Sequence, residues 1–356
     1  MITCRPALQG GCARASTVAD SSTPTLKGWA YTCGVLVALV VLAAAPASAE
    51  NAHLAVIVGL AGEPEHGELF RKWADTLVET ASGRFGIAQD RIIYLNADAE
   101  AKGATGKSTR QDVQLAFERL AKQATADDIV MVVLIGHGSF SGGVAKFNLV
   151  GPDMTAAEFA PLLKRLAAKQ VVFVNTASAS GPFLEALAGS GRTIVTATRS
   201  GAEQYSTLFG GFFIDALTNE AADTDKNGRV SVLEAFNAAK RDVASAYQRE
   251  GIMLTEHAML DDSGDGKGTH EPAVEASDGR VASIVALGSA ADAVPLPDDP
   301  TLRQLYVDRR ALERRVESLK LLKSGMDAAR YATELEKLLT DLALKTQEIR
   351  AIEGKK

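Results

Sequence analysis

The chain has 356 residues, a formal net charge of −6 and a hydrophobic content of 46%. That much apolar material is enough for one large domain and an accessory element. The charge is spread along the chain, and no basic stripe with interleaved aromatic residues is present, so the composition argues against a nucleic-acid partner.

The N-terminus has the pattern of a secretory signal. Lys27 precedes the apolar run Val35–Ala45, and the small residues Ala47–Ala49 come directly before Glu50. A charged flank, a short apolar core and an A-x-A site are typical of a cleaved signal peptide. The run is shorter than the roughly 20 residues of a membrane span. The sequence therefore predicts a signal peptide over residues 1–49, a periplasmic or secreted location and no transmembrane span after cleavage. An uncleaved anchor is the alternative.

The cysteines all precede the expected cleavage site, at Cys4, Cys12 and Cys33. If cleavage occurs there, the mature protein has no thiol, no disulfide and no thiolate metal ligand. Cysteine chemistry is then excluded.

Residues 50–290 alternate between strand-length apolar runs and amphipathic helical stretches. The expected strands are Leu54–Leu60, Arg91–Leu95, Ile129–Ile135, Gln170–Asn175 and Thr193–Thr198. The expected helices are Glu68–Ser82, Thr109–Gln123, Thr155–Ala168 and Ser206–Asn219. Strands that are apolar throughout and alternate with helices predict a three-layer α/β/α domain with a mostly parallel sheet. A short hairpin over Gly142–Gly151 and a last strand over Val281–Leu287 are also expected.

A break in composition follows this domain. Residues 291–300 are rich in Ala, Asp and Pro and are expected to form a linker, and residues 301–356 are charged with helical periodicity. Two apolar stripes separated by Ser324 and Gly325 predict an antiparallel helical hairpin or coiled coil. The first stripe is Leu302, Leu305, Leu312, Val316, Leu319 and Leu322; the second is Met326, Tyr331, Leu335, Leu338, Leu339, Leu342 and Ile349. Both a self-packed stalk and a coil for self-association or for a protein partner fit this pattern.

Two loops of the expected sheet carry chemistry. The strand Ile129–Ile135 runs into Gly136-His137-Gly138, and the next strand runs into a turn of small residues that contains Ser178. Both loops leave the carboxyl ends of parallel strands, where α/β proteins form their sites. If these strands are neighbours, His137 and Ser178 lie side by side, as a base and a nucleophile would.

These residues resemble those of the caspase, legumain and metacaspase group of cysteine peptidases (clan CD). Legumains, of peptidase family C13, carry Ala-Cys-Glu-Ser-Gly at the second turn, whereas this chain reads Ala177-Ser178-Ala179-Ser180-Gly181. The segments Thr196–Gly201 and Thr255–Asp262 also look like that group, and the resemblance is closest to bacterial legumain-like proteins. It implies a caspase-like fold, His137 as the catalytic histidine, and Ser178 in place of the cysteine nucleophile.

The replacement leaves two hypotheses open. A serine hydroxyl needs a well-oriented base, and the base normally needs an orienting carboxylate, for which the sequence shows no candidate. The first hypothesis is an exported, inactive legumain-like peptidase homologue that acts as a calcium-binding scaffold or binding protein. The second is a peptidase or esterase that uses Ser178 and His137.

One loop matches the calcium-binding pattern of EF-hands. Its aspartates, asparagine, glycine and final glutamate stand at every constrained position, between helical stretches that span residues 212–248. The expected Ca²⁺ ligands are Asp223, Asp225, Asn227, Arg229 through its carbonyl, Ser231 and Glu234. The alternative is a solvated acidic turn that caps the second helix.

Two further patterns are weaker. Asp261, Ser263 and Asp265 repeat the first half of the calcium pattern, but Pro272 stands where its glutamate belongs, so a half-formed calcium loop and a plain turn are both open. Ala101–Ser108 nearly matches a phosphate-binding loop, but it does not leave a strand directly. We therefore expect a flexible turn there and no nucleotide partner.

Overall fold

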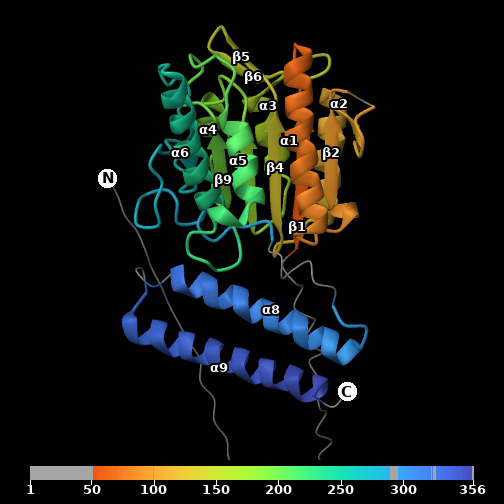
Figure 1. Ribbon diagram of the computed structural model, residues 1–356, viewed down its shortest axis with the longest axis vertical. Coiled ribbons are helices and arrows are strands. Elements are labelled where there is room, and N and C mark those ends of the chain that lie inside the picture. Colours follow the sequence, from red (N-terminus) through yellow and green to blue (C-terminus); the bar gives the residue numbers. More distant parts are fainter. Residues whose placement is uncertain (1–50, 99, 289–295, 322, 324–325, 355–356) are drawn as a thin grey trace, which may run out of the picture. The chain divides into compact units, whose positions relative to one another are not determined.

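The computed structural model describes residues 51–98, 100–288, 296–321, 323 and 326–354 (Figure 1). The predicted signal peptide with its cysteines, residues 291–295 of the predicted linker and the Ser324–Gly325 turn lie outside this range. None of the described helices combines the length and apolar composition that a membrane crossing requires.

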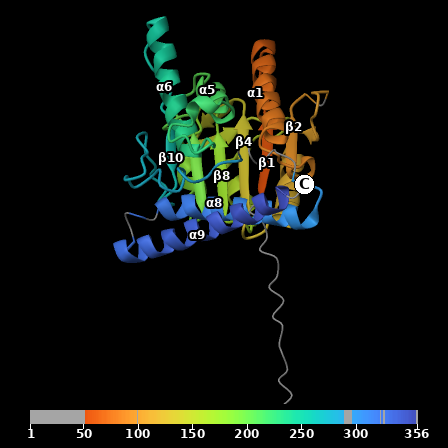
Figure 2. The ribbon, with the colours of Figure 1, turned by 60° about the horizontal axis from the view of Figure 1, so that its bottom comes forward.

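A seven-stranded sheet forms the middle layer, with strand order β10-β9-β8-β4-β1-β2-β3. The strands are β1 (Ala52–Val58), β2 (Ile92–Asn96), β3 (Gly106–Lys107), β4 (Ile129–Ile135), β8 (Gln170–Asn175), β9 (Arg192–Thr196) and β10 (Met259–Asp261). All neighbours are parallel except β10, which runs antiparallel to β9. Figure 2 shows β10, β8, β4, β1 and β2 side by side in this order. The strands expected from Leu54 to Thr198 are confirmed.

Helices cover both faces of the sheet (Figure 1). One face carries α1 (Pro64–Gly83), α5 (Phe209–Thr218) and α6 (Val232–Glu250); the other carries α2 (Arg110–Gln123), α3 (Ala156–Leu163) and α4 (Pro182–Leu187). The predicted three-layer, mostly parallel architecture is therefore confirmed. The helix α4 was not expected, because its six residues are too few to show a helical period.

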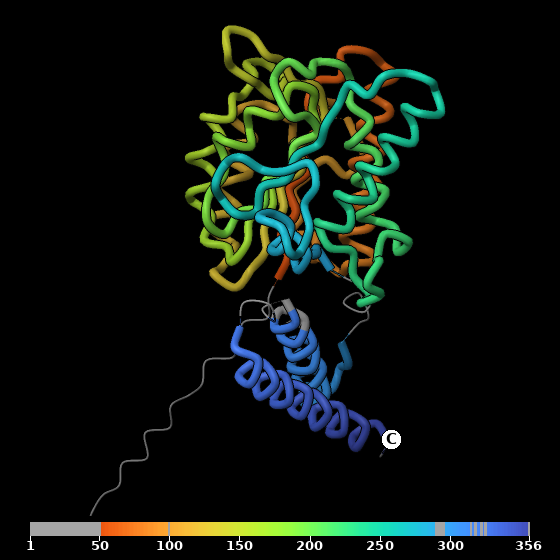
Figure 3. The backbone as a smooth tube through the Cα atoms, turned by 90° about the vertical axis from the view of Figure 1, so that its left-hand side faces the viewer, coloured from red at the N-terminus to blue at the C-terminus, as the bar shows by residue number. Residues whose placement is uncertain are grey.

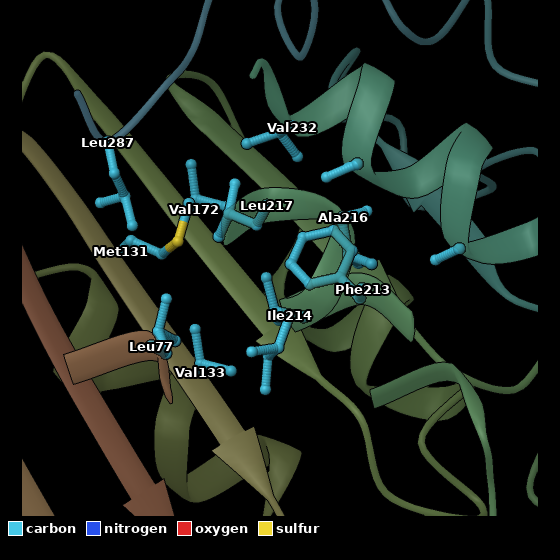
Figure 4. Close-up of a cluster of buried hydrophobic side chains, with 14 of the residues drawn as sticks. Leu77, Met131, Val133, Val172, Phe213, Ile214, Ala216, Leu217, Val232 and Leu287 are labelled. Carbon is cyan, nitrogen blue, oxygen red and sulfur yellow. The ribbon is translucent and has the colours of Figure 1, made fainter. Parts of the chain in front are cut away.

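The strands are apolar throughout because both of their faces are buried. Met131 and Val133 of β4 point to the α1 and α5 side, where Figure 4 shows them near Leu77, Phe213 and Ile214. The alternate residues of β4 belong to the opposite core, with the aromatic side chains of α2, α3 and α4. Full burial of a side chain such as Phe213 stabilises the fold by about 1.5–3 kcal/mol.

A small antiparallel sheet follows β4 directly. It consists of β5 (Gly138–Ser141), β6 (Val144–Phe147) and β7 (Met154–Thr155). Gly142 and Gly143 form the turn between β5 and β6 with φ angles of 58° and 79°, which side chains with a Cβ rarely adopt. The predicted hairpin is present but begins earlier than Gly142, so His137 lies between a buried strand and this hairpin.

Two local expectations are wrong. Val281–Leu287 is not a strand: it forms turns and coil that cover the start of α6, where the N–H groups of Val232 and Leu233 donate to the carbonyls of Val285 and Ala282. Its apolar residues reflect this burial and no sheet pairing. The flexible turn expected before Thr109 contains the edge strand β3 at Gly106–Lys107, paired with β2.

The C-terminal helices α8 (Pro300–Leu321) and α9 (Ala328–Glu353) form the predicted hairpin (Figure 3). Its antiparallel sense follows from Tyr306, near the start of α8, whose hydroxyl lies 2.6 Å from Oε1 of Glu353 at the end of α9. Val316, Leu319 and Leu338 are buried between the helices. Leu339, which we expected in the same stripe, is 46% exposed because it lies on the outer face of α9.

We predict that Asp262→Ala destabilises the domain by about 2–3 kcal/mol, because two buried N–H groups lose an ionised acceptor. The Asp262 carboxylate accepts hydrogen bonds from Gly279 (2.8 Å) and Ala282 (2.7 Å) and so fixes the segment that covers α6. Urea unfolding with a calcium chelator present measures the change, and Asp242→Ala on the exposed side of α6 is the matched control. Equal stability of the two variants would contradict this role.

Candidate functional site

The pairing of β4 with β8 brings the two predicted loops together. Leu134 is the register partner of Asn175, so the residues that follow each strand lie at the same edge of the sheet. The Ser178 hydroxyl donates to the carbonyl of Gly138 at 3.1 Å and accepts from the Gly138 N–H at 3.3 Å. The structure therefore places His137 and Ser178 on adjoining loops, as the sequence predicts.

The Ser178 turn is tightly constrained. Ser178 is 4% exposed, and Ala179 has a φ of 54°, a conformation that residues with a Cβ rarely adopt. The N–H of Ala179 donates to the carbonyl of Glu203 at 2.7 Å, which ties the turn to the loop after β9. A Cβ at Gly138 would clash with the Ser178 carbonyl, so only glycine allows this approach of the two loops.

The imidazole of His137 lies among aromatic rings. Its centroid is 4.7 Å from that of His66 and 5.1 Å from that of Phe70, both on α1. Burial, reinforced by the positive charge of His66, lowers the pKa of His137, against the raising effects of a hydrogen bond to the Ala61 backbone and of the charge of Glu63. The lowered pKa favours the neutral form of His137.

The hydroxyl of Ser178 is engaged by the backbone of Gly138, both as donor and as acceptor. Within the described residues, the carboxylate that acts on His137 is that of Glu63, through its charge. An activated serine, in contrast, donates its proton to a base that a carboxylate orients.

A carboxylate–histidine pair on the other side of the turn was not predicted. Nδ1 of His257 lies 2.8 Å from Oε1 of Glu203, and the other carboxylate oxygen accepts from the N–H groups of Arg199 and His257. Glu203 follows β9 and His257 precedes β10, and these strands pair. Glu203 and His257 are 54 positions apart in the sequence, so no local sequence signal indicates this contact.

The predicted calcium loop lies between α5 and α6. Asp223, Asp225 and Glu234 offer carboxylate oxygens that all lie within 4.8 Å of one another. The Asp223 carboxylate accepts from the N–H groups of Asn227 and Gly228, and Oε1 of Glu234 accepts from those of Thr224 and Asp225. Burial, together with the charge of Glu234, raises the pKa of Asp225. A cation would relieve this crowding of carboxylates.

The remaining predicted ligands are placed differently. Ser231 is the N-cap of α6, and its hydroxyl forms a capping box with Glu234. Arg229 donates its N–H to the Asn227 side chain, whose amide in turn donates to Asp225. The structure thus groups the three carboxylates with Asn227 and uses Ser231 to begin the helix.

The second acidic loop repeats the hydrogen bonds of the first. Asp261 accepts from the N–H of Gly266, five residues later, as Asp223 does from Gly228. Oδ1 of Asp278 accepts from the N–H groups of the second and third loop residues, Asp262 and Ser263, at 3.2 and 3.1 Å. Glu234 does the same in the first loop. Asp278 therefore occupies the place of the missing glutamate, and sequence spacing does not reveal it.

Comparisons with known proteins agree with the fold. Residues 105–260 match the model of the Peptidase C13 family. The matched range includes both loops at the edge of the sheet and the first acidic loop. A crystal structure of protein GSU0716 from Geobacter sulfurreducens aligns over 59% of this chain and 92% of that chain, with 14% identity and a TM-score of 0.40. No curated protein matches the chain.

We predict that His66→Ala raises the pKa of His137, because it removes both the covering ring and the positive charge that lower it. Glu63→Gln should lower that pKa further, since the Glu63 charge raises it. A titration of the His137 ring protons by NMR measures both changes, with His270→Ala as control. A lower or unchanged pKa in His66→Ala would contradict the described geometry.

Proposed function

Starting from a domain of legumain-like ancestry, we propose that this protein is an exported, calcium-binding pseudopeptidase that acts in the periplasm or outside the cell as a binding or scaffold protein. In this proposal Ser178 stands where relatives of the domain carry their cysteine nucleophile, and His137 is the retained histidine. In this role the protein binds other molecules without cleaving them.

One observation carries this proposal: the Ser178 hydroxyl bonds to the Gly138 backbone, both as donor and as acceptor. A thiol is partly ionised near neutral pH, but a serine hydroxyl is not and needs a base that takes its proton. Replacement of the thiol by a hydroxyl therefore removes the nucleophile unless His137 turns toward Ser178 and gains an orienting partner.

The alternative is a peptidase or esterase that uses Ser178 and His137. Their adjoining loops favour it, as does the strained Ala179, because strained residues cluster at active sites. A bound substrate would have to displace the Ser178 hydroxyl from Gly138.

We predict that a fluorophosphonate probe, which labels activated serines, does not label the purified protein, because nothing takes the proton from Ser178. Mass spectrometry of the treated protein checks this, with Ser178→Ala and Ser180→Ala as matched variants and an active serine hydrolase as the reagent control. Labelling that is lost in Ser178→Ala and His137→Ala but retained in Ser180→Ala would establish the hydrolase instead.

The calcium part of the proposal rests on the first acidic loop. Its carboxylates Asp223, Asp225 and Glu234 already converge, its glycine at position six has a φ of 83°, and Val230 is buried beneath it. Oxygen ligands of this number and charge suit Ca²⁺. Because the loop joins two helices that cover the sheet, bound calcium would stabilise the whole domain.

The second acidic loop is proposed as a weaker calcium site. Asp261, Ser263 and Asp265 supply the first half of the pattern, and Asp278 supplies the carboxylate from outside it. Asp261 is fully buried, whereas Asp265 is exposed, so the two loops differ in how freely they can rearrange around an ion.

We predict that Ca²⁺ raises the melting temperature, by an amount equivalent to about 2.7 kcal/mol when its concentration is about 100 times Kd. Calorimetry with and without millimolar Ca²⁺ measures this. Asp223→Ala and Glu234→Gln should remove most of the effect, Asp265→Ala a smaller part, and Asp242→Ala none. An unchanged melting temperature of the unaltered protein at millimolar Ca²⁺ would contradict calcium binding.

The partner is proposed to bind through the C-terminal hairpin, as a second copy or another protein. Leu339 and Leu344 are 46% and 53% exposed, and they lie with Ala343 on the side of α9 away from Leu338. A second apolar stripe that no described residue covers is the usual mark of a helix with a further binding partner.

We predict that a chain truncated after Ala290 forms a smaller oligomer than the full chain. The double variant Leu339→Glu with Leu344→Glu should have the same effect, because both changes remove the apolar stripe. Light scattering measures the mass, and Thr333→Glu on the same exposed side is the control. A monomeric full chain would exclude self-association and leave another protein as the partner.

A further inference from the structure

The ring of His137 contacts the ring of His66, a residue of α1 that belongs to none of the sequence motifs. The two rings are nearly perpendicular, at 89°, with centroids 4.7 Å apart. We infer that His66 and His137, completed by Glu63, bind a divalent transition-metal ion of the zinc type. This site is separate from the proposed calcium loops and goes beyond the proposed function.

The spacing of the rings suits one shared ion. Zinc binds imidazole nitrogens at about 2.0–2.1 Å in tetrahedral geometry, which places the centroids of two ligating rings about 5 Å apart. The 4.7 Å between His66 and His137 is close to that value. To share an ion, each ring has to direct one nitrogen at a common point between them.

Both rings are half-buried and in contact with each other. Across the described ranges no side-chain hydrogen bond holds either ring, so their nitrogens are available to a shared ion. The neutral form of imidazole is the one that binds metals.

Glu63 supplies the third ligand. It is exposed, stands three residues before His66 and is the N-cap of α1 without a side-chain hydrogen bond there. Its charge already acts on His137. Among the described residues, the carboxylate of Glu63 does not already converge with the nitrogens of His66 and His137. Its side chain therefore has to rotate toward the two rings to bind the same ion. Two histidines and one glutamate leave a fourth position open for water or a bound molecule.

The chain contains a matched comparison pair, His257 and His270. Their centroids lie 6.0 Å apart, wider than a shared ion requires, and Nδ1 of His257 is bonded to Glu203 while that of His270 is bonded to the Ala258 carbonyl. The competing explanation for His66 and His137 is an aromatic cluster with Phe70, whose centroid is 5.8 and 5.1 Å from theirs. Such a cluster needs no metal.

The test is a calorimetric titration of the untagged full chain with Zn²⁺ in a buffer saturated with Ca²⁺, so that the acidic loops are occupied. We expect one equivalent of zinc to bind, a tenfold or greater loss of affinity in His66→Gln and His137→Gln, a smaller loss in Glu63→Gln, and no change in His270→Gln. Cobalt should give the visible absorption of a tetrahedral site in the unaltered chain and lose it in His66→Gln. Melting temperatures without metal show that each variant is folded.

Absence of zinc binding, or binding that His66→Gln leaves intact, would overturn the inference and leave the aromatic cluster. An equal loss in His270→Gln would overturn it as well, because it would place the ion at the other pair. The proposed function is tested with calcium, the serine probe and the oligomeric mass, so failure here is distinguishable from failure there.

Discussion

The parallel pairing of β4 with β8 is the constraint on which the rest of the site depends. Both strands are buried on both faces, so a shift of one residue would exchange their side chains between two different cores. The register that satisfies both cores joins Leu134 to Asn175 and thereby sets the loop of His137 against the turn of Ser178. The site is thus fixed by core packing, whatever chemistry its side chains perform.

In the proposed pseudopeptidase, the same constraint would preserve the geometry of the site after its nucleophile is replaced. The loops remain in contact through the backbone of Gly138, to which the Ser178 hydroxyl now bonds. A hydroxyl fits the place of a thiol, but it needs a stronger and better oriented base. The ring of His137 lies against two aromatic side chains of α1, and its burial lowers its pKa and so favours the neutral form.

Sequence reasoning succeeds where a feature is local. Three features carry their signal within about a dozen residues: the run Ile129–Ile135, the calcium pattern from Asp223 to Glu234 and the helical pattern that begins at Thr109. The structure has a strand, a converging acidic loop and a helix there. The metal itself remains a proposal. Within the candidate site, the sequence predicts that His137 and Ser178 lie on adjoining loops if the strands before them are neighbours in the sheet, and β4 and β8 are neighbours.

Features that depend on distant contacts could not be predicted. Asp278 completes the second acidic loop, Glu203 orients His257, and Asp262 fixes the coil that we expected to be a strand. In each case a carboxylate meets backbone or ring groups that are far away in the sequence. Leu339 shows the same limit on a helix: periodicity identifies an apolar residue but not which of two stripes it belongs to.

The most direct measurement of the central claim is a crystal structure of the mature protein that locates Oγ of Ser178 and the ring of His137. The account predicts that Oγ lies within hydrogen-bond distance of the Gly138 backbone and that the imidazole packs against the rings of His66 and Phe70. An imidazole nitrogen bonded to Oγ of Ser178, with a carboxylate bonded to the opposite ring nitrogen, would contradict it.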